Sequence, residues 1–423
     1  MTEDVIDELH RRGLIAQSTD ETALRAALAE GTVAYYCGFD PTAPSLHVGS
    51  LLQFMVLRAL QRAGHQPVVL VGGATGLIGD PRPTSERQLN DPAVVASWVQ
   101  RIREQVAPFL ELPAERDGLK GPVYVDNLDW TAGLSAIDFL RDIGKHYRVG
   151  TMLKKDAVAA RLNSEAGISY TEFSYQILQG LDYRQLYLEY GCVLETGGSD
   201  QWGNLTSGVD LIKRAEGTSV HAIGTPLITN SDGRKFGKTE GNAIWLDPKL
   251  TSAYAMYQFW LNHDDADVID RLKVFTFLSR EEIDRLADAV ATEPFKREAQ
   301  RVLALEVTSI VHGHEAALGS IAAADALFGQ GDLAALDAAT LGSAIRELPG
   351  ADATSDSLVS QLLVETGLSA SLGDARRAIA QGGVYLNNVK VEDETITIGS
   401  SILPGGFAVL RRGKKTLAGI RIS

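Results

Sequence analysis

The stretch 32–50 most constrains the fold, because a strand pattern, a loop and a helix start follow one another without interruption. Its first eight residues are rich in β-branched and aromatic side chains, and two prolines then exclude regular structure. Helical spacing of apolar residues begins at Leu46, so Ser45 is expected to cap a helix. We therefore predict a strand, a loop and a helix, with His47 and Gly49 in the first helical turn.

A first helical turn of this kind suits an anion. Its backbone N–H groups are unpaired and the helix dipole favours negative charge there, so a triphosphate is the natural guest. His47 can donate to a phosphate oxygen, and Gly49 would let a base or a ribose lie against bare backbone. The alternative is a helix start with an incidental His and Gly, and this short motif alone does not decide between the two.

The length of 423 residues exceeds one ordinary core, so two or three domains are expected, with 45% hydrophobic residues to fill them. Cys37 and Cys192 lie far apart without metal-type spacing, which is typical of a reduced, cytoplasmic protein. The N-terminus is acidic and amphipathic, and the apolar runs are short. We therefore predict neither a signal peptide nor a membrane span.

The charge is segregated along the chain. A formal net charge of −14 argues against a protein that coats DNA or another nucleic acid through bulk electrostatics. Residues 357–423, however, carry eight lysines and arginines against five acidic residues. A local basic face at the C-terminal end is therefore expected.

A parallel α/β sheet is predicted for the first part of the chain. Residues 66–71 form a near-continuous apolar run, as in a parallel strand that is buried on both faces. Strand, helix and strand in this order imply a right-handed crossover. The run ends in a glycine-rich turn that Asp80 closes, and ligands collect at that edge of open α/β sheets.

The helix expected at 171–190 carries a polar stripe within an apolar sequence. Tyr175, Gln179 and Asp182 stand at positions i, i+4 and i+7, so they share one face. Surface polarity is the alternative, but the apolar residues around the stripe place the helix in a core. We therefore favour a stripe that points into a pocket.

Two further glycine-rich segments follow. A strand at 192–196 ends in the turn 197–204, whose Gly198 and Asp200 suit a ribose and its hydroxyls. The loop 232–239 then places Lys235 and Lys238 three residues apart among glycines, as in a mobile cationic strap. An ordinary solvated loop is the alternative for this last segment.

The chain is expected to divide into four parts: a catalytic α/β domain at 1–225 with a mostly helical insertion at about 83–170, a helical domain at 226–330, a linker at 331–356 and a compact α/β unit at 357–423. Residues 126–162 carry more apolar bulk than a surface excursion needs, which makes them a candidate oligomer contact. The basic run near residue 412 suits RNA.

Taken together, the stretch 41–50, the turn 197–204 and the loop 235–239 resemble the signature motifs and the ribose turn of class I aminoacyl-tRNA synthetases, in particular the bacterial tyrosyl-tRNA synthetases. Residues 374–387 look like part of an S4 RNA-binding domain. The resemblance covers nearly the whole chain. It implies a Rossmann-like catalytic domain with an insertion, then an α-helical tRNA-binding domain, then a small S4-like domain.

The resemblance implies an activity as well. Such an enzyme activates L-tyrosine with ATP, taken as Mg-ATP, to tyrosyl-adenylate and pyrophosphate, and then transfers tyrosine to the 3' end of its tRNA. A homodimer without a tightly bound metal is the expected form. The alternatives are a tryptophanyl-tRNA synthetase, or a non-catalytic RNA-binding protein on a synthetase scaffold.

The resemblance also implies roles for single residues. ATP and its pyrophosphate would be served by Asp40, Thr42, His47, Gly49, Gly198, Asp200, Lys235, Lys238 and Thr239. Tyrosine would be held by Tyr36 and Asp182 at its phenol, and by Asp80, Tyr175, Gln179 and Gln201 around its amino and carboxylate groups.

Three positions depart from the pattern of the family. The loop 80–87 is shortened and lacks a lysine, so its phosphate contacts would depend on Arg82 or Arg87. Ser50 replaces the second histidine of the first motif. Glu195 stands where glutamine is expected, which adds a negative charge near the amino acid pocket.

Overall fold

The computed structural model describes residues 4–81, 89–110, 119–165, 167–229, 231, 236–239, 242–399, 401–414 and 416–422, with only the backbone at residues 156, 157, 238, 239 and 242. The chain divides into two compact units, which are described separately. The first consists of Met1–Asp247 and Ile269–Ile283, and the second of Pro248–Val268 and Asp284–Ser423.

The first unit is built on a six-stranded sheet in the order β1-β6-β5-β2-β3-β4. The strands are β1 (Gln17–Ser18), β2 (Ala34–Phe39), β3 (Gln66–Val71), β4 (Val123–Asp126), β5 (Cys192–Gly198) and β6 (His221–Thr225). Neighbours from β4 to β6 pair in parallel, and only the short edge strand β1 is antiparallel. The chain leaves the central strand β2 toward β3 on one side and returns through β5 on the other, which is the point where open α/β sheets bind ligands.

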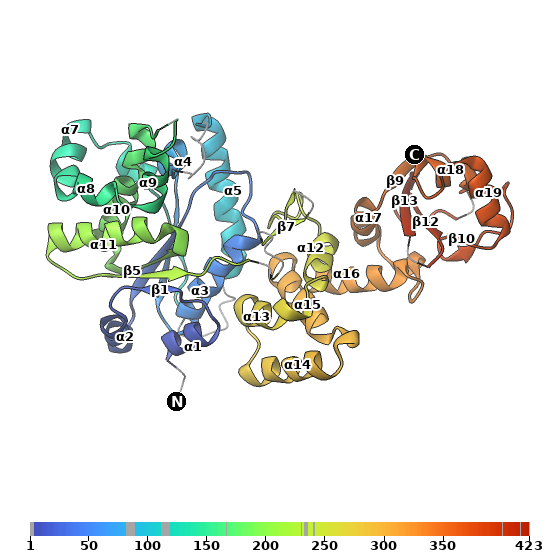
Figure 1. Cartoon of the computed structure of the whole chain (residues 1–423), viewed down its shortest axis with the longest axis horizontal. Coiled ribbons are helices and arrows are strands. Elements are labelled where there is room, and N and C mark those ends of the chain that lie inside the picture. Colours follow the sequence, from blue (N-terminus) through green and yellow to red (C-terminus); the bar gives the residue numbers. More distant parts are fainter. Residues whose placement is uncertain are drawn as a thin grey trace. The chain divides into compact units, whose positions relative to one another are not determined.

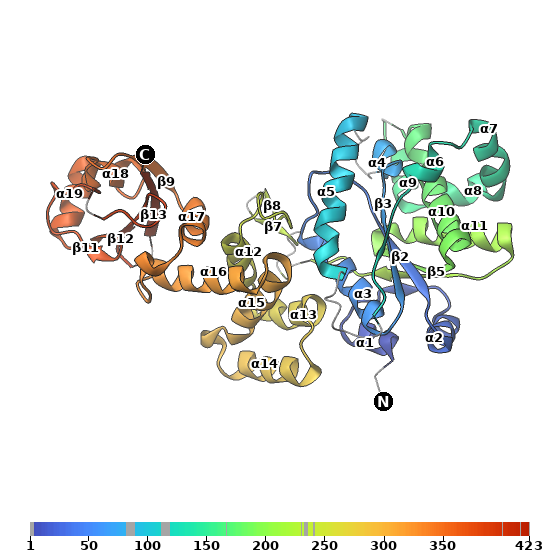
Figure 2. The ribbon, with the colours of Figure 1, turned by 180° about the vertical axis from the view of Figure 1, so that it is seen from behind.

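Helices cover both faces of this sheet (Figures 1 and 2). The larger ones are α3 (Leu51–Arg62) and α5 (Pro92–Leu110) on one face, and α10 (Tyr170–Tyr190) and α11 (Trp202–Glu216) on the other. Short elements complete the unit: α1 (Val5–Arg11), α2 (Glu21–Glu30), η1 (Val48–Ser50), α4 (Thr75–Ile78), α6 (Leu128–Thr131), α7 (Ala136–Asp138), η2 (Phe139–Ile143), η3 (Gly144–His146), α8 (Val149–Met152), α9 (Asp156–Leu162), η4 (Ser199–Gln201), β7 (Lys238–Thr239) and β8 (Asn242–Ala243).

Aromatic packing fixes the helices to the two faces. Phe54 of α3 lies between Phe39 of β2 and Phe109 of α5, with ring centroids 5.1 and 4.6 Å away. On the opposite face Tyr36 of β2 meets Tyr183 of α10 at 5.2 Å. Alternate residues of one strand thus bind different helices, as the pleat requires. The strands expected at 32–39, 66–71 and 192–196 and the helix expected at 171–190 are confirmed.

The second unit joins helices to a five-stranded sheet in the order β11-β10-β12-β13-β9. Its helices are α12 (Ala253–Leu261), most of α14 (Arg280–Thr292), η5 (Pro294–Lys296), α15 (Glu298–His312), α16 (His314–Leu327), η6 (Leu333–Ala335), α17 (Ala338–Arg346), α18 (Val359–Glu365) and α19 (Leu372–Ala380), while α13 (Asp265–Phe275) belongs to both units. The strands are β9 (Gly350–Ala353), β10 (Val384–Leu386), β11 (Val389–Lys390), β12 (Phe407–Arg412) and β13 (Thr416–Ile422).

The linker expected at 331–356 is wrong as a structureless connector. It contains η6, α17 and β9, and β9 pairs in parallel with β13. Leu341 and Ile345 of α17 share a buried cluster with Tyr254 of α12 and with Val409 and Leu417 of the sheet. The small residues of this segment hid its periodicity from sequence reasoning, because alanine and glycine fit a tight core without forming a clear apolar stripe.

The range expected for the helical insertion, 83–170, includes a strand of the parallel sheet. Strand β4 lies inside it and extends the parallel sheet next to β3, with Val68 opposite Val123. Four residues are too few for a clear strand pattern. The remaining domain boundaries stay a prediction. Among the described residues, no helix combines the length and the apolar character needed to cross a bilayer.

Candidate functional site

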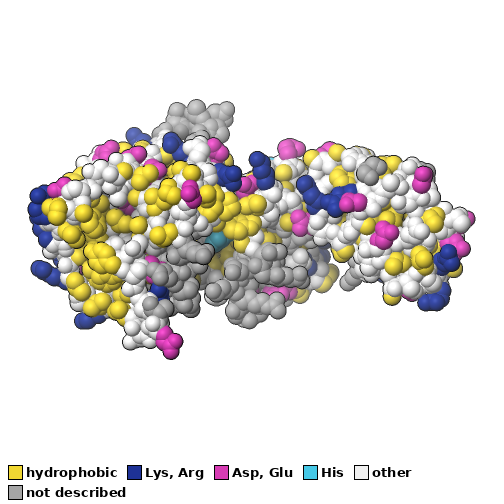
Figure 3. Space-filling model, turned by 90° about the horizontal axis from the view of Figure 1, so that it is seen from above, with side chains coloured by type: hydrophobic (Ala, Val, Ile, Leu, Met, Phe, Trp, Pro, Cys, Tyr) yellow, Lys and Arg dark blue, Asp and Glu magenta, His cyan; other side chains and the backbone are white. Residues whose placement is uncertain are grey.

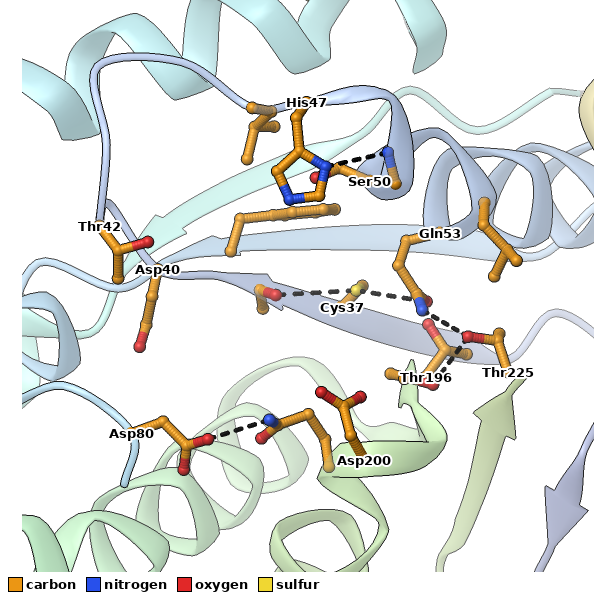
Figure 4. A pocket seen from close by; sticks show the side chains of 18 of the residues that line it. Cys37, Asp40, Thr42, His47, Ser50, Gln53, Asp80, Thr196, Asp200 and Thr225 are labelled. Carbon is orange, nitrogen blue, oxygen red and sulfur yellow. Dashed lines mark hydrogen bonds between the residues drawn. The ribbon is translucent and has the colours of Figure 1, made fainter. Parts of the chain in front are cut away.

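A cavity of about 690 Å³ opens at the carboxyl ends of β2 and β5 (Figure 4). It brings together twelve of the residues singled out from the sequence: Tyr36, Asp40, Thr42, His47, Gly49, Asp80, Tyr175, Gln179, Asp182, Gly198, Asp200 and Gln201. His47 enters from one side of the view in Figure 4, and Asp80 and Asp200 enter from the other. Lys235, Arg82 and Arg87 lie outside the described residues, as do the side chains of Lys238 and Thr239.

The first motif forms a tighter turn than expected. Helix α3 begins at Leu51 and not at Leu46, because η1 precedes it. Ser45 does not cap the helix; its hydroxyl donates to the Leu46 carbonyl at 2.8 Å and accepts from Asp247 N at 3.2 Å. His47 instead caps η1, and Ser50 is the N-cap of α3 without a side-chain hydrogen bond.

The hydrogen bond of the His47 ring determines which of its nitrogens carries the proton. Its Nδ1 accepts a hydrogen bond from the Gly49 N–H at 3.0 Å, so the neutral ring carries its proton on Nε2 and acts there as a donor. A Cβ built on Gly49 would lie 2.6 Å from Cε1 of this ring. Glycine at position 49 therefore makes room for the imidazole itself, in addition to any nucleotide.

The base of the lysine loop is anchored beside this turn. Val48 N donates to Ile244 O at 2.9 Å, and Leu246 N donates to Leu46 O at 2.8 Å. Gly237 has a φ of +78°, and a Cβ there would lie 2.7 Å from the Val48 side chain. Glycine is therefore required at this contact. The fold holds the backbone of β7, which carries Lys238, next to the His47 turn.

The closed end of the cavity is lined by Tyr36 and Asp182, whose side chains are 1% and 3% exposed. Asp182 accepts hydrogen bonds from Asn127 Nδ2 and Trp130 Nε1, each at 2.9 Å. Burial raises the pKa of the Asp182 carboxyl to about 7, although the Asn127 and Trp130 hydrogen bonds oppose the shift.

Sequence reasoning missed Asn127 and Trp130. Asn127 also accepts from Ala74 N at 2.7 Å and donates to Thr75 Oγ1 at 2.9 Å, which ties β4 to the glycine turn after β3. Both residues follow a strand end, which is where open α/β sheets place their ligand groups. That signal was hidden because β4 itself had gone unrecognised.

The polar stripe of α10 faces the cavity as predicted. Tyr175 Oη donates to Asp40 Oδ2 at 2.6 Å, and Thr75 Oγ1 donates to Asp40 Oδ1 at 2.6 Å. Burial, followed by the charge of Asp40, raises the pKa of the Tyr175 phenol well above its usual value. Gln179 donates through Nε2 to Oε1 of Glu195 at 2.9 Å.

Asp80 and Asp200 line the side opposite His47. Gln201 Nε2 and Asn204 Nδ2 each donate to the Asp80 carboxylate at 3.0 Å, which fixes its orientation. Asp200 approaches the backbone so closely that a Cβ on Gly198 would lie 2.4 Å from its Oδ1. Because Gly198 has no side chain at the end of β5, the Asp200 carboxylate there can accept hydrogen bonds from the hydroxyls of a ribose.

The floor between these groups contains a polar pair that the sequence did not reveal. Gln53 of α3 donates to Thr225 Oγ1 at 2.7 Å, and both residues line the cavity. The site as a whole combines buried acceptors at one end with the His47 turn and its Nε2 donor at the other. It can therefore hold a zwitterion and a nucleotide side by side.

Comparison with known proteins matches two families along the chain. Residues 28–329 match "tRNA synthetases class I (W and Y)", and residues 341–419 match "Tyrosine--tRNA ligase SYY-like C-terminal domain". A tyrosine-tRNA ligase of Leifsonia xyli subsp. xyli is 66% identical over 419 residues, which are 99% of this chain and 94% of the relative. The chain belongs to the class I tyrosine-tRNA ligases.

Other members of the family agree over the full length. A tyrosine-tRNA ligase of Streptomyces griseus subsp. griseus is 58% identical across 99% of both chains. Among solved structures, a C-terminally truncated mitochondrial tyrosyl-tRNA synthetase of Aspergillus nidulans covers 75% of this chain and 92% of its own, at 32% identity and a TM-score of 0.68. A tryptophanyl-tRNA synthetase of Plasmodium falciparum has a TM-score of 0.57 at 15% identity and covers 75% of this chain and 89% of its own, and it shares the fold alone.

Proposed function

We propose that this protein activates L-tyrosine with ATP to tyrosyl-adenylate and then transfers tyrosine to the 3' end of its tRNA. The observation that carries the proposal is the closed end of the cavity, where Tyr36 meets an Asp182 carboxyl that Asn127 and Trp130 hold in place. A buried hydroxyl and a buried carboxylate at the end of the cavity suit a phenol. An indole N–H could donate to Asp182 but would offer the Tyr36 hydroxyl no acceptor.

The chemistry needs position and charge rather than a protein nucleophile. The tyrosine carboxylate attacks the α-phosphorus of ATP, the bond to the β-phosphate bridge breaks, and pyrophosphate leaves with the negative charge. Asp80, Tyr175 and Gln179 would hold the ammonium group, while Asp200 would accept from the ribose hydroxyls. Each contact restricts the reactants to the geometry of attack, which lowers the entropic part of the barrier.

The growing charge on the leaving group requires donors. His47 Nε2 would meet the phosphates, with Asp40 and Thr42 close by. The three N–H groups of η1 already donate to Ile244 O, His47 Nδ1 and His47 O, so the unpaired amides expected from the sequence are not present there. Lys235, Lys238 and Thr239 would contact the pyrophosphate, because Gly237 of the same loop packs against Val48. Mg²⁺ would enter as the counter-ion of ATP and not as a resident metal.

In the second step the tRNA 3' hydroxyl attacks the tyrosyl carbonyl and adenylate leaves. Exposed cations of the C-terminal sheet domain would bind the tRNA backbone: the Arg376 and Arg377 side chains are 59% and 71% exposed. Their ion pairs are long, 3.3 Å from Arg376 to Glu394 and 3.9 Å from Arg377 to Asp374, whereas the less exposed Arg412 lies 2.7 Å from Asp374. We place the reaction in the cytoplasm, where the free thiols of Cys37 and Cys192 would stay reduced.

A homodimer is part of the proposal. The segment between β4 and α10 leaves large apolar side chains in solvent: Leu128, Ile137, Leu140, Val149, Leu153 and Leu162 are 39–67% exposed. Figure 3 looks down on the first unit and shows hydrophobic side chains, in yellow, gathered at its left end. Such patches are rare on monomers and mark contacts. A monomeric mass in solution at micromolar concentration would contradict a dimer.

A variant of the lysine loop tests the proposed activity. Replacement of Lys238 by alanine should leave the equilibrium binding of tyrosine almost unchanged and slow adenylate formation by a factor of about 10² to 10³, because only the leaving pyrophosphate needs the cation. Lys213→Ala, at an exposed position in the last turn of α11, is the matched control and should leave both quantities unchanged. A parallel loss of tyrosine affinity and rate in Lys238→Ala would instead show a structural lysine.

A further inference from the structure

Two polar groups at the closed end of the cavity are buried and, among the described residues, make no hydrogen bond of good geometry, although they lie within reach of each other. They are the Tyr36 hydroxyl and Oε2 of Glu195, on side chains that are 1% and 2% exposed. Tyr36 of β2 lies opposite Glu195 of β5 in the sheet register, so both side chains leave the same face. The other oxygen of Glu195 accepts from Gln179 at 2.9 Å. Unpartnered atoms of this kind are costly unless a proton or a ligand satisfies them.

Glu195 shares the cavity with a second acid, and the two differ in their hydrogen bonds. Asp182 accepts from two N–H donors, Asn127 Nδ2 and Trp130 Nε1, whereas among the described residues Glu195 accepts from one N–H donor, Gln179, and lies within reach of the Tyr36 hydroxyl. Donors stabilise the charged form of a carboxyl, so a proton shared by the two acids resides on Glu195. Burial raises the pKa of Glu195 to about 8, with the charge of Asp182 acting in the same direction.

We infer that protonated Glu195 donates a hydrogen bond through Oε2 to the Tyr36 oxygen. The Tyr36 hydroxyl in turn donates a hydrogen bond to the phenol oxygen of bound tyrosine. The substrate phenol donates a hydrogen bond to the Asp182 carboxylate. Each hydroxyl in this chain gives one hydrogen bond and receives one, which satisfies both buried atoms at once. The inference rests on the proposed function, because it needs tyrosine in the cavity.

The chain gives Glu195 a role in substrate choice. When Glu195 ionises it becomes an acceptor, so the Tyr36 proton turns toward it and the substrate phenol loses its donor. Phenylalanine has no oxygen at this place and is unaffected. Glu195 is thus a positioning residue that sets the direction in which Tyr36 donates, and glutamine at position 195 would imitate the protonated form permanently.

Other titratable groups face Glu195 from the surrounding elements: Tyr36, Cys37, Tyr147, Lys155, Asp182 and Tyr183. Burial raises the pKa of the phenols and of the thiol far enough to keep them neutral near pH 8. Two groups therefore titrate nearby. Burial lowers the pKa of Lys155 to about 8 and raises that of Asp182 to about 7.

The test is the ratio of kcat/KM for tyrosine to kcat/KM for phenylalanine in ATP-pyrophosphate exchange, measured across pH. The ratio cancels the titration of the substrate amino group and of ATP, which are common to both amino acids. In the native protein it should fall about three- to tenfold as Glu195 ionises, since one hydrogen bond to the phenol is lost. In Glu195→Gln this fall should be absent, and only the rise that accompanies the ionisation of Asp182 near pH 7 should remain.

Two further variants make the result unambiguous. Lys155→Met removes a cation that lowers the pKa of Glu195, so the fall should remain and move to higher pH. Tyr36→Phe removes the link in the chain, so the fall should vanish even if Glu195→Gln does not fold. A flat ratio in the native protein, or an unchanged fall in Glu195→Gln or Tyr36→Phe, would overturn the inference. Absence of tyrosine activation at every pH would instead contradict the proposed function.

Discussion

Trp130→Phe should separate the recognition of the phenol from the rest of catalysis. The change keeps an aromatic ring next to α10 but removes the Nε1–H that donates to Asp182 Oδ1 at 2.9 Å. Asp182 is 3% exposed, so water does not replace this donor. A hydrogen bond to a charged group contributes about 1.5–3 kcal/mol. At about 1.4 kcal/mol per factor of ten, kcat/KM for tyrosine should fall about 10- to 150-fold.

The pH dependence of kcat/KM for tyrosine should also shift in Trp130→Phe, and the direction of the shift can be predicted. Fewer donors to the carboxylate raise the pKa of Asp182 further above its buried value of about 7. Since the ionised form accepts the phenol proton, the rise of kcat/KM for tyrosine with pH should move to higher pH in Trp130→Phe.

The assay is ATP-pyrophosphate exchange with tyrosine and with phenylalanine from about pH 6 to about pH 8. Trp98→Phe makes the same chemical change on α5, outside the lining of the cavity, and should leave both substrates unchanged. Equal losses for tyrosine and phenylalanine in Trp130→Phe would refute the reasoning, because they would show a packing defect and no role at the phenol.

Three further outcomes follow from the same contacts. Asp182→Ala should raise the activation free energy that corresponds to kcat/KM for tyrosine by several kcal/mol, and Tyr36→Phe should raise it by about 1 kcal/mol, with much smaller changes for phenylalanine. Equal losses for both amino acids would assign these residues to the fold. Glu195→Gln should raise the Tm of the first unit in calorimetry, because a carboxyl with a folded pKa raised from 4.5 to about 8 stabilises the native protein at low pH and loses that stabilisation as pH rises to about 8. The gain should therefore grow across that window, and a gain that is independent of pH would contradict the buried-acid reasoning. The double change of Arg376 and Arg377 to Ala should weaken tRNA charging, reduce the salt dependence of tRNA binding by about two phosphate contacts and spare pyrophosphate exchange; unchanged charging would exclude this face.

Point variants are needed for the tRNA question because of the way the second unit is built. Removal of residues 357–423 would take away β12 and β13, whose Val409 and Leu417 lie in one buried cluster with Tyr254 and Leu341. The helices of this unit would then expose part of their core. A truncated protein would mix the loss of tRNA contacts with a loss of stability.

The elements with strong periodicity could be predicted from the sequence. The buried run at 66–71 and the long helix at 170–190 carry enough residues for one interpretation to dominate, and the polar stripe of α10 does point into the cavity. The start of α3 was misplaced because the His47 side chain caps a 3₁₀ turn, and helical spacing alone cannot distinguish that turn from an α-helical one.

The partners of the substrate groups could not be predicted in the same way. Asn127 and Trp130 lie more than fifty residues before Asp182 in the chain, and only the pairing of β4 with β3 brings them to it. Glu195 was recognised as a departure from the family. Its position opposite Tyr36, and the lack of a well-formed hydrogen bond to its Oε2, follow from the strand register and could not be read from the sequence. Long-range contacts of this kind leave no spacing signal in a single sequence.

The central claim is that the cavity selects tyrosine and joins it to ATP. Amino-acid-dependent ATP-pyrophosphate exchange, measured with each of the common amino acids in turn, tests both parts at once. The account predicts rapid exchange with tyrosine, and with phenylalanine a rate that is lower by orders of magnitude, because the buried Tyr36 and Asp182 would lose their partner. Exchange that is faster with tryptophan, or equal for tyrosine and phenylalanine, would contradict it.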